Sequence, residues 1–283
     1  MQNLARRAGF RIGIAWRVAA LVLVAAIVPP HPSAGAAAAK GAAATAAAGG
    51  ESETIVYAAA SLRDVLQELA PACGKANGTR LVFNFAGSGE LAYQIETMNK
   101  ADVFFAADTV TMDEVARAGL VDQSSRRTPL SNRLVVIGPT DTTASVKAVA
   151  DLAAPWVKRL ALAEPRSVPA GRYAKAWLVK TGVWGAIKDR VLPAVDVRAA
   201  LAAVESGAAD LGVVYRTDAR IAMRARVLYE VPAADGPKIE YVLAALKHRP
   251  GLATSRKVVA WLSGSEAARV FEAAGFVTRA PDP

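Results

Sequence analysis

The sequence has almost none of the residues from which disulfides and the commonest metal sites are built. Its 283 residues include one cysteine, Cys73, and two histidines, of which only His248 lies beyond residue 50. One thiol cannot form a disulfide within the chain, so stability must come from an apolar core, which a hydrophobic content of 53% allows. We expect Cys73 to be buried and inert. A histidine- or cysteine-rich metal site is excluded by count, whereas an all-carboxylate site is not, although no EF-hand spacing is present.

A run of apolar residues long enough to cross a membrane is also missing. The run VAALVLVAAIV, residues 18–28, is too short to span a bilayer. It follows four arginines and precedes the small residues Ala34-Gly35-Ala36, which is the order of a secretory signal. We therefore predict a cleaved signal peptide at 1–36, a low-complexity leader at 37–53 and a periplasmic mature protein. A short membrane anchor is the alternative, and the pair Arg6-Arg7 leaves Sec or twin-arginine export open.

The mature part lacks a strong charge of either sign. The whole chain carries a net charge of +9, but residues 1–50 hold five basic residues and no acidic ones. The remainder therefore has 29 basic and 25 acidic residues, a net charge of +4, with no block of like charges. This is not the charge pattern of a nucleic-acid-binding protein, so we expect no nucleic-acid partner.

What the sequence does have is an alternation of short apolar runs and amphipathic helical patterns. The spacing predicts strands at 54–60, 81–86, 101–107, 133–139, 159–164, 210–215, 226–232 and 239–246. It predicts helices at 61–70, 88–98, around 111–118, 169–182, 197–207, 251–263 and 265–274. This order is typical of an α/β fold with a parallel sheet and helices on its faces. We predict two α/β lobes, the first at 54–132 plus 241–283 and the second at 133–240.

Four of the predicted helices begin with residues that suit a helix start. Ser61 has Asp64 three residues later, which resembles a capping box, and Ser88 stands between two glycines. Pro169 suits a first helical position, with Ala170 next, and Asp196 suits an N-cap. Helix starts expose free N–H groups and the positive end of the helix dipole, so several of them together would bind an anion. Taken singly, each is an ordinary cap.

The motifs around these starts resemble those of the periplasmic molybdate-binding proteins, the substrate-binding subunits of ABC importers for molybdate. The similar stretches run from about 54 to 278: VYAAASLRDVL, FNFAGSGELAYQIE, ADVFFAAD, VPAGRYAK, DVRAALAAVESGAADLGVVYRTDA and a final GFV. The resemblance implies the type II periplasmic-binding-protein fold, with a ligand cleft between two α/β lobes. It also implies an extracytoplasmic receptor, not an enzyme, which delivers molybdate, and tungstate as well, to a membrane permease. We expect a monomer without a cofactor.

The resemblance also implies which residues hold the ligand. Serine hydroxyls fall on Ser61 and Ser88, backbone amide donors on Ala170 and Val197, and a tyrosine hydroxyl on Tyr215. These groups would bind molybdenum only through the molybdate oxygens, with no direct bond to the metal. Because they only donate hydrogen bonds, such a site disfavours protonated oxyanions. The stretch GSG at 87–89 departs from relatives that have more serines there, which removes one secondary hydrogen bond.

Other functions fit the residues less well. A receptor for sulfate, phosphate or a small carboxylate is the main alternative, and Arg172 is the candidate to bind a carboxylate. The stretch GSGELA at 87–92, with Asp108 about 20 residues later, is a loose match to a dinucleotide-binding motif, but it follows the second strand. A serine hydrolase would need Ser88 with His248, and the G-x-S-x-G pattern fails at both outer positions. Asp102 and Asp108 are interpreted as turn or cap residues.

Overall fold

The computed structural model describes residues 52–279. The predicted signal peptide, 1–36, lies outside these residues, as does the leader, 37–53, apart from Ser52 and Glu53. Glu53 is already the first residue of strand β1. Within the described part of the chain, no helix is both long and apolar enough to cross a membrane.

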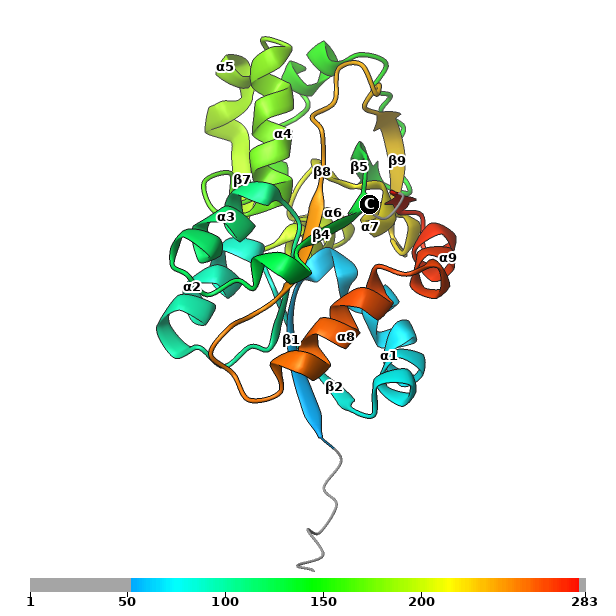
Figure 1. Cartoon of the computed structure of the whole chain (residues 1–283). Coiled ribbons are helices and arrows are strands. Elements are labelled where there is room, and N and C mark those ends of the chain that lie inside the picture. Colours follow the sequence, from blue (N-terminus) through cyan, green and yellow to red (C-terminus); the bar gives the residue numbers. More distant parts are fainter. Residues whose placement is uncertain (1–51, 280–283) are drawn as a thin grey trace, which may run out of the picture. The chain divides into compact units, whose positions relative to one another are not determined.

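The described residues form two β-sheets (Figure 1). The first sheet has the order β11-β4-β10-β3-β1-β2. Its strands are β1 (Glu53–Ala59), β2 (Arg80–Ala86), β3 (Val103–Ala106), β4 (Arg127–Ser131), β10 (Tyr241–Ala245) and β11 (Val277–Thr278). The second sheet has the order β7-β6-β8-β5-β9. Its strands are β5 (Leu134–Pro139), β6 (Leu160–Ala163), β7 (Val191–Ala194), β8 (Leu211–Tyr215) and β9 (Ala225–Glu230).

Both sheets are mixed, and the predicted parallel pairing holds for part of each. Strand β1 pairs in parallel with β2 and β3, and β6 pairs in parallel with β7 and β8. Strand β10, however, is antiparallel to β3, and β5 is antiparallel to β8. The reason lies in how the chain enters each sheet. β10 arrives directly from the second sheet, at the edge where β1 and β3 end, and therefore runs against them.

Nine helices accompany the strands in residues 52–279 and give each lobe its α/β character. The helices of the first lobe are α1 (Arg63–Asn77), α2 (Ser88–Met98), α3 (Thr109–Arg117), α8 (Leu252–Leu262) and α9 (Ser265–Ala273). Those of the second are α4 (Pro169–Lys180), α5 (Trp184–Ile187), α6 (Val197–Glu205) and α7 (Arg216–Arg220). The prediction of two α/β lobes is confirmed. The residue boundaries assigned to the lobes stay a prediction, although the chain passes between the sheets after β4 and after β9.

The first sheet buries both of its faces. Neighbouring residues of a strand point to opposite faces, so Phe104 and Phe105 of β3 enter different apolar clusters. Phe105 lies with Leu66 of α1 and with residues of α8 and α9, whereas Phe104 lies with Leu91 of α2 and Met112 of α3. Figure 1 shows α2 and α3 on one side of β1 and α1 and α8 on the other. Helices on both faces leave the edge at which β1, β2 and β3 end free to carry a site.

Candidate functional site

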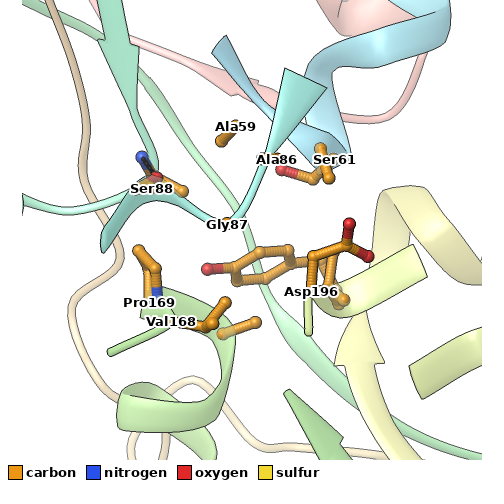
Figure 2. A pocket seen from close by; sticks show the side chains of 13 residues that line it. Ala59, Ser61, Ala86, Gly87, Ser88, Val168, Pro169 and Asp196 are labelled. Carbon is orange, nitrogen blue, oxygen red and sulfur yellow. Dashed lines mark hydrogen bonds between the residues drawn. The ribbon is translucent and has the colours of Figure 1, made fainter. Parts of the chain in front are cut away.

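A small pocket lies where four helices begin. Its wall contains the residues Ala59, Ala60, Ser61, Ala86, Gly87, Ser88, Ala107, Val168, Pro169, Ala170, Asp196, Val197 and Tyr215. Most of these residues lie at or just before the starts of α1 and α2 in the first lobe and of α4 and α6 in the second, while Ala107 follows β3 and Tyr215 ends β8. Figure 2 shows Ser61 and Ser88 on one side of the pocket, with Val168, Pro169 and Asp196 facing them. All five residues expected to bind the ligand, Ser61, Ser88, Ala170, Val197 and Tyr215, lie in this wall.

Three of the four helix starts have no side-chain cap. The residues that precede the helical turns, Ala59, Gly87 and Val168, cannot accept a hydrogen bond through a side chain. Asp196 does cap α6, as predicted, by accepting a hydrogen bond from the Ala199 N–H at 2.8 Å. The first N–H groups of a helix have no acceptor within the helix, so the uncapped starts offer free donors at the positive end of each helix dipole. This combination suits an anion.

The structure corrects the predicted role of Ser61 as a helix cap. Ser61 lies inside a 3₁₀ turn, Ala60–Leu62, which precedes α1, and its side chain caps no N–H group. Asp64, the expected partner in a capping box, forms an ion pair with Arg198 of α6 instead. The hydroxyl of Ser61 is 3.0 Å from that of Tyr241, and both side chains are buried.

Ser88 is also not a cap, because it is the first residue of α2 and Gly87 precedes it. The N–H of Ala107, which follows β3, donates to Ser88 Oγ at 3.0 Å. A backbone N–H can only donate, so the Ser88 oxygen is the acceptor in this bond. The hydroxyl proton of Ser88 therefore remains available for another group in the pocket.

Tyr215 is the last residue of β8 and is almost wholly buried, at 1% exposure. Its hydroxyl finds no hydrogen-bond partner among residues 52–279. Burial raises the pKa of Tyr215 well above its ordinary value, so the phenol stays protonated and can donate. A buried hydroxyl without a partner is costly, which makes this group a good donor for a bound ligand.

No basic side chain lines the pocket. Two arginines of the second lobe that lie near wall residues in the sequence, Arg172 and Arg198, are paired with acids. Arg172 of α4 donates through Nε and Nη2 to Asp108 Oδ2, at 2.9 and 2.5 Å. Asp108 is the N-cap of α3, which confirms its interpretation as a cap residue. Arg172 is thus held in an ion pair between the lobes, and it is not a member of the pocket wall.

Arg198, next to Val197, is the second paired arginine. Its Nε lies 2.6 Å from Oδ1 of the fully buried Asp218, while Nη2 contacts Asp64 of the first lobe. Burial raises the pKa of Asp218 to about 7, against the lowering effect of Arg198. The pocket is therefore electrically neutral in its wall apart from Asp196, whose carboxylate is engaged by the Ala199 N–H. Among residues 52–279 no cluster of three acidic, histidine or cysteine side chains could hold a metal ion.

The lobes approach each other closely around the pocket. A Cβ atom placed on Gly89 of α2 would lie 2.3 Å from the backbone oxygen of Ser167, which precedes α4. Within the second lobe, a Cβ atom on Gly171 would lie 2.0 Å from the oxygen of Ala163, so α4 packs against β6 only without a side chain there. The cavity volume of the pocket is only about 10 Å³. Ligand pockets for drug-sized molecules run from about 300 to 1,000 Å³, so this pocket suits a compact solute alone.

Sequence reasoning missed Tyr241, Asn132 and Asp218, which lie behind the residues of the pocket wall. Their contacts join residues far apart in the chain, such as Ser61 and Tyr241, and no local motif marks them. Tyr241 reads as a plain strand residue, and Asp218 as a surface acid in a short helical segment. Their connection to the site becomes visible only in the structure, where all three side chains are buried behind the pocket.

Comparisons with known proteins agree with this architecture. Residues 54–277 match the family model described as bacterial extracellular solute-binding protein. The molybdate-binding protein ModA of Escherichia coli K12 is 38% identical over 236 residues, which cover 81% of this chain and 90% of that protein. ModA of Haemophilus influenzae is 32% identical and covers 80% of this chain and 90% of its own length.

Solved structures show the same fold. The substrate-binding domain of a putative molybdenum ABC transporter from Clostridium difficile is 28% identical, with a TM-score of 0.63, and the match covers 81% of this chain and 99% of that domain. The periplasmic molybdate-binding protein of Azotobacter vinelandii has a TM-score of 0.70 at 24% identity, over 80% of this chain and all of that one. The predicted two-lobed periplasmic-binding-protein fold is thereby confirmed. The chain belongs to the family of bacterial extracellular solute-binding proteins.

Proposed function

We propose that this protein is an extracytoplasmic receptor that binds molybdate and delivers it to the membrane permease of an ABC importer. The observation that carries the proposal is the convergence of four helix starts on one small pocket with no basic side chain in its wall. Such a site holds a compact dianion by hydrogen bonds and helix dipoles. The ModA relatives, which span most of this chain, support molybdate as that anion. A binding role of this kind needs no catalytic residue or cofactor.

In this proposal the hydroxyls of Ser61, Ser88 and Tyr215 and the backbone N–H groups of Ala170 and Val197 donate to the molybdate oxygens. The molybdenum atom contacts no protein atom directly. Tungstate has the same shape and charge, so the same donors would bind it. The protein would act as a periplasmic monomer.

Sulfate is the second candidate, because it too is a tetrahedral dianion without a proton. The sulfate-binding protein SubI of Mycobacterium tuberculosis has a TM-score of 0.71 with this chain at 15% identity, which establishes a shared fold alone. A dinucleotide enzyme is disfavoured, because the pocket is small and Gly87 and Gly89 pack against the second lobe. Gly87 would place a Cβ 3.0 Å from the Val195 oxygen, which leaves no room for a pyrophosphate there.

Calorimetric titration of the mature protein with molybdate, tungstate, sulfate and phosphate tests the proposal. We expect one molybdate or tungstate per chain, with sulfate and phosphate at least tenfold weaker. The reason is that the donors are fixed around a cavity whose radius is set by lobe closure. Equal affinity for sulfate would contradict molybdate selectivity. Absence of binding to all four anions would overturn the receptor function.

A further inference from the structure

Behind Ser61 lies a line of buried hydrogen-bonding groups that ends at the junction between the lobes. Asn132 follows β4, where the chain leaves the first sheet, and Tyr241 begins β10, where the chain returns. Asn132 Nδ2 donates to the Tyr241 hydroxyl at 3.3 Å and to Thr217 Oγ1 at 2.9 Å. The Tyr241 hydroxyl is in turn 3.0 Å from Ser61 Oγ.

The direction of these bonds follows from one backbone group. The N–H of Arg133 lies 2.9 Å from Asn132 Oδ1, and a backbone N–H can only donate. The amide oxygen of Asn132 is therefore fixed as an acceptor on that side, so its NH₂ group faces Tyr241 and Thr217. The oxygen of Tyr241 then accepts a hydrogen bond from Asn132.

The hydroxyl proton of Tyr241 has one available hydrogen-bond acceptor among residues 52–279. Burial raises the pKa of Tyr241 far above its ordinary value, so the phenol remains protonated. A buried O–H without an acceptor is costly, and Ser61 Oγ is the acceptor within reach among residues 52–279. Tyr241 therefore donates to Ser61, and the Ser61 oxygen accepts. The remaining Ser61 proton lies in the pocket wall.

We propose that Asn132 and Tyr241 are positioning residues that orient the Ser61 hydroxyl so that its proton, and not a lone pair, faces the ligand. This inference rests on the proposed oxyanion-binding function and adds a specificity mechanism to it. If the ligand oxygen at this position carried a proton, its O–H group would face the O–H group of Ser61. The ligand proton would then have no acceptor in that direction. The chain Asn132–Tyr241–Ser61 thus selects unprotonated dianions, such as molybdate, over hydrogenphosphate.

Tyr241→Phe tests the proposal, since it removes the proton that Ser61 accepts and keeps the ring. The Ser61 oxygen would then be free to accept a hydrogen bond from a ligand O–H. We expect molybdate affinity to fall about tenfold. Hydrogenphosphate affinity should stay constant or rise, so the ratio of the two dissociation constants should shift by tenfold or more. Both anions are titrated calorimetrically at a mildly alkaline pH.

Two further variants separate this role from a loss of stability. Tyr57→Phe removes a phenol hydroxyl from β1, on the opposite face of the same sheet, and should leave the ratio unchanged. Asn132→Asp presents only acceptors to Tyr241, which reverses the chain and turns the Ser61 lone pairs toward the ligand. The added negative charge weakens the binding of molybdate and hydrogenphosphate to the same extent. The ratio of their dissociation constants therefore reports only the reversed direction of the hydrogen bonds.

A double-mutant cycle with Ser61→Ala completes the test on molybdate alone. If Tyr241 acts through Ser61, Tyr241→Phe should have no further effect in the Ser61→Ala background. An equal loss in both backgrounds, or an unchanged affinity ratio in Tyr241→Phe and Asn132→Asp, would overturn the positioning role. Failure of the wild-type protein to bind molybdate would instead overturn the proposed function.

Discussion

At the scale of single residues, Tyr215 combines full burial with a hydroxyl that has no partner among residues 52–279. Tyr215→Phe deletes this donor and keeps the ring. Hydrogen bonds to charged groups contribute about 1.5–3 kcal/mol, so molybdate affinity should fall roughly 10- to 100-fold. The melting temperature of the ligand-free protein should not fall, because the fold itself does not use the hydroxyl.

Calorimetry and thermal unfolding of the same preparation measure the two effects of Tyr215→Phe separately. A loss of affinity together with a lower melting temperature would indicate a packing role for the hydroxyl. Unchanged affinity would remove Tyr215 from the proposed binding site.

A second residue-scale feature, remote from the pocket, is Asp122. Hydrogen bonds from Arg256 of α8 and from Ser124 hold the pKa of this buried carboxyl at about 2, against an ordinary value of 3.8. A depressed pKa means that Asp122 stabilises the fold above about pH 4 and that this contribution is lost as pH falls toward 2. Asp122→Asn should therefore lower the free energy of unfolding by roughly 1–2 kcal/mol at neutral pH.

Denaturant unfolding of wild type and Asp122→Asn at several pH values from about 7 to about 3 follows this contribution. The difference between the two proteins should shrink as the pH falls. A difference that stays constant over this range would show that the carboxylate charge is not the stabilising group.

At the scale of secondary-structure elements, the start of α6 lets a backbone donor be tested apart from its side chain. Asp196 is extended, with φ −154° and ψ −178°, which is the conformation that a residue before proline prefers. Proline is also well accepted at a first helical position, where the N–H has no acceptor within the helix. Val197→Pro should therefore keep the fold, remove the proposed amide donor and lower binding by at least ~2 kcal/mol.

Val197→Ala is the control for this prediction, because it keeps the N–H group and loses only two methyl groups. We expect it to bind molybdate within a few-fold of wild type. Circular dichroism should show both variants folded. A folded Val197→Pro protein with normal affinity would mean that the Val197 amide does not face the anion.

Elements are also where prediction from sequence works best here. The helix 88–98 has the predicted bounds, and the predicted start of α4 at Pro169 is confirmed. Strands β4 and β7 are not predicted, because each is short, contains a proline, Pro129 or Pro193, and has little apolar periodicity. Ser61 was misread as a cap because a 3₁₀ turn intervenes before α1, which a capping motif cannot reveal.

The part of the site that sequence reasoning could not supply consists of long-range polar contacts. Ser61 meets Tyr241, and Arg172 meets Asp108, only because the chain crosses twice between the lobes. The local pattern around each of these residues fits an ordinary strand or helix. The wall of the pocket, by contrast, could be anticipated, because it is made of helix starts that have a local signature.

At the scale of the whole described chain, two ion pairs join the lobes on opposite faces of the first sheet. Arg198 of α6 reaches Asp64 of α1, and Arg172 of α4 reaches Asp108 at the start of α3. Helices α1 and α3 belong to different apolar clusters, one on each face. The pairs therefore stabilise the approach of the lobes from two sides of the pocket.

Asp64→Asn tests one of these pairs and leaves the buried contact of Arg198 with Asp218 in place. We expect molybdate to dissociate a few-fold faster, because an exposed pair contributes up to about 1 kcal/mol. Glu230→Gln is the matched control, since Glu230 is as exposed as Asp64, at 54%, and pairs with Arg216 inside one lobe. Stopped-flow experiments measure the molybdate dissociation rate of each variant. Equal rates in the two variants would exclude a role for Asp64 in holding the lobes together.

Gly89, whose missing side chain lets α2 lie against Ser167, has an evolutionary consequence. Alanine in a helix is more stable than glycine by roughly 0.5–1 kcal/mol, so Gly89→Ala should strengthen the ligand-free protein against denaturant. The same methyl group would collide with the Ser167 carbonyl and keep the lobes apart, which should weaken molybdate binding in calorimetry. A variant that gains stability without losing affinity would refute this. Selection for stability of the ligand-free protein and selection for ligand affinity thus favour different residues at this position.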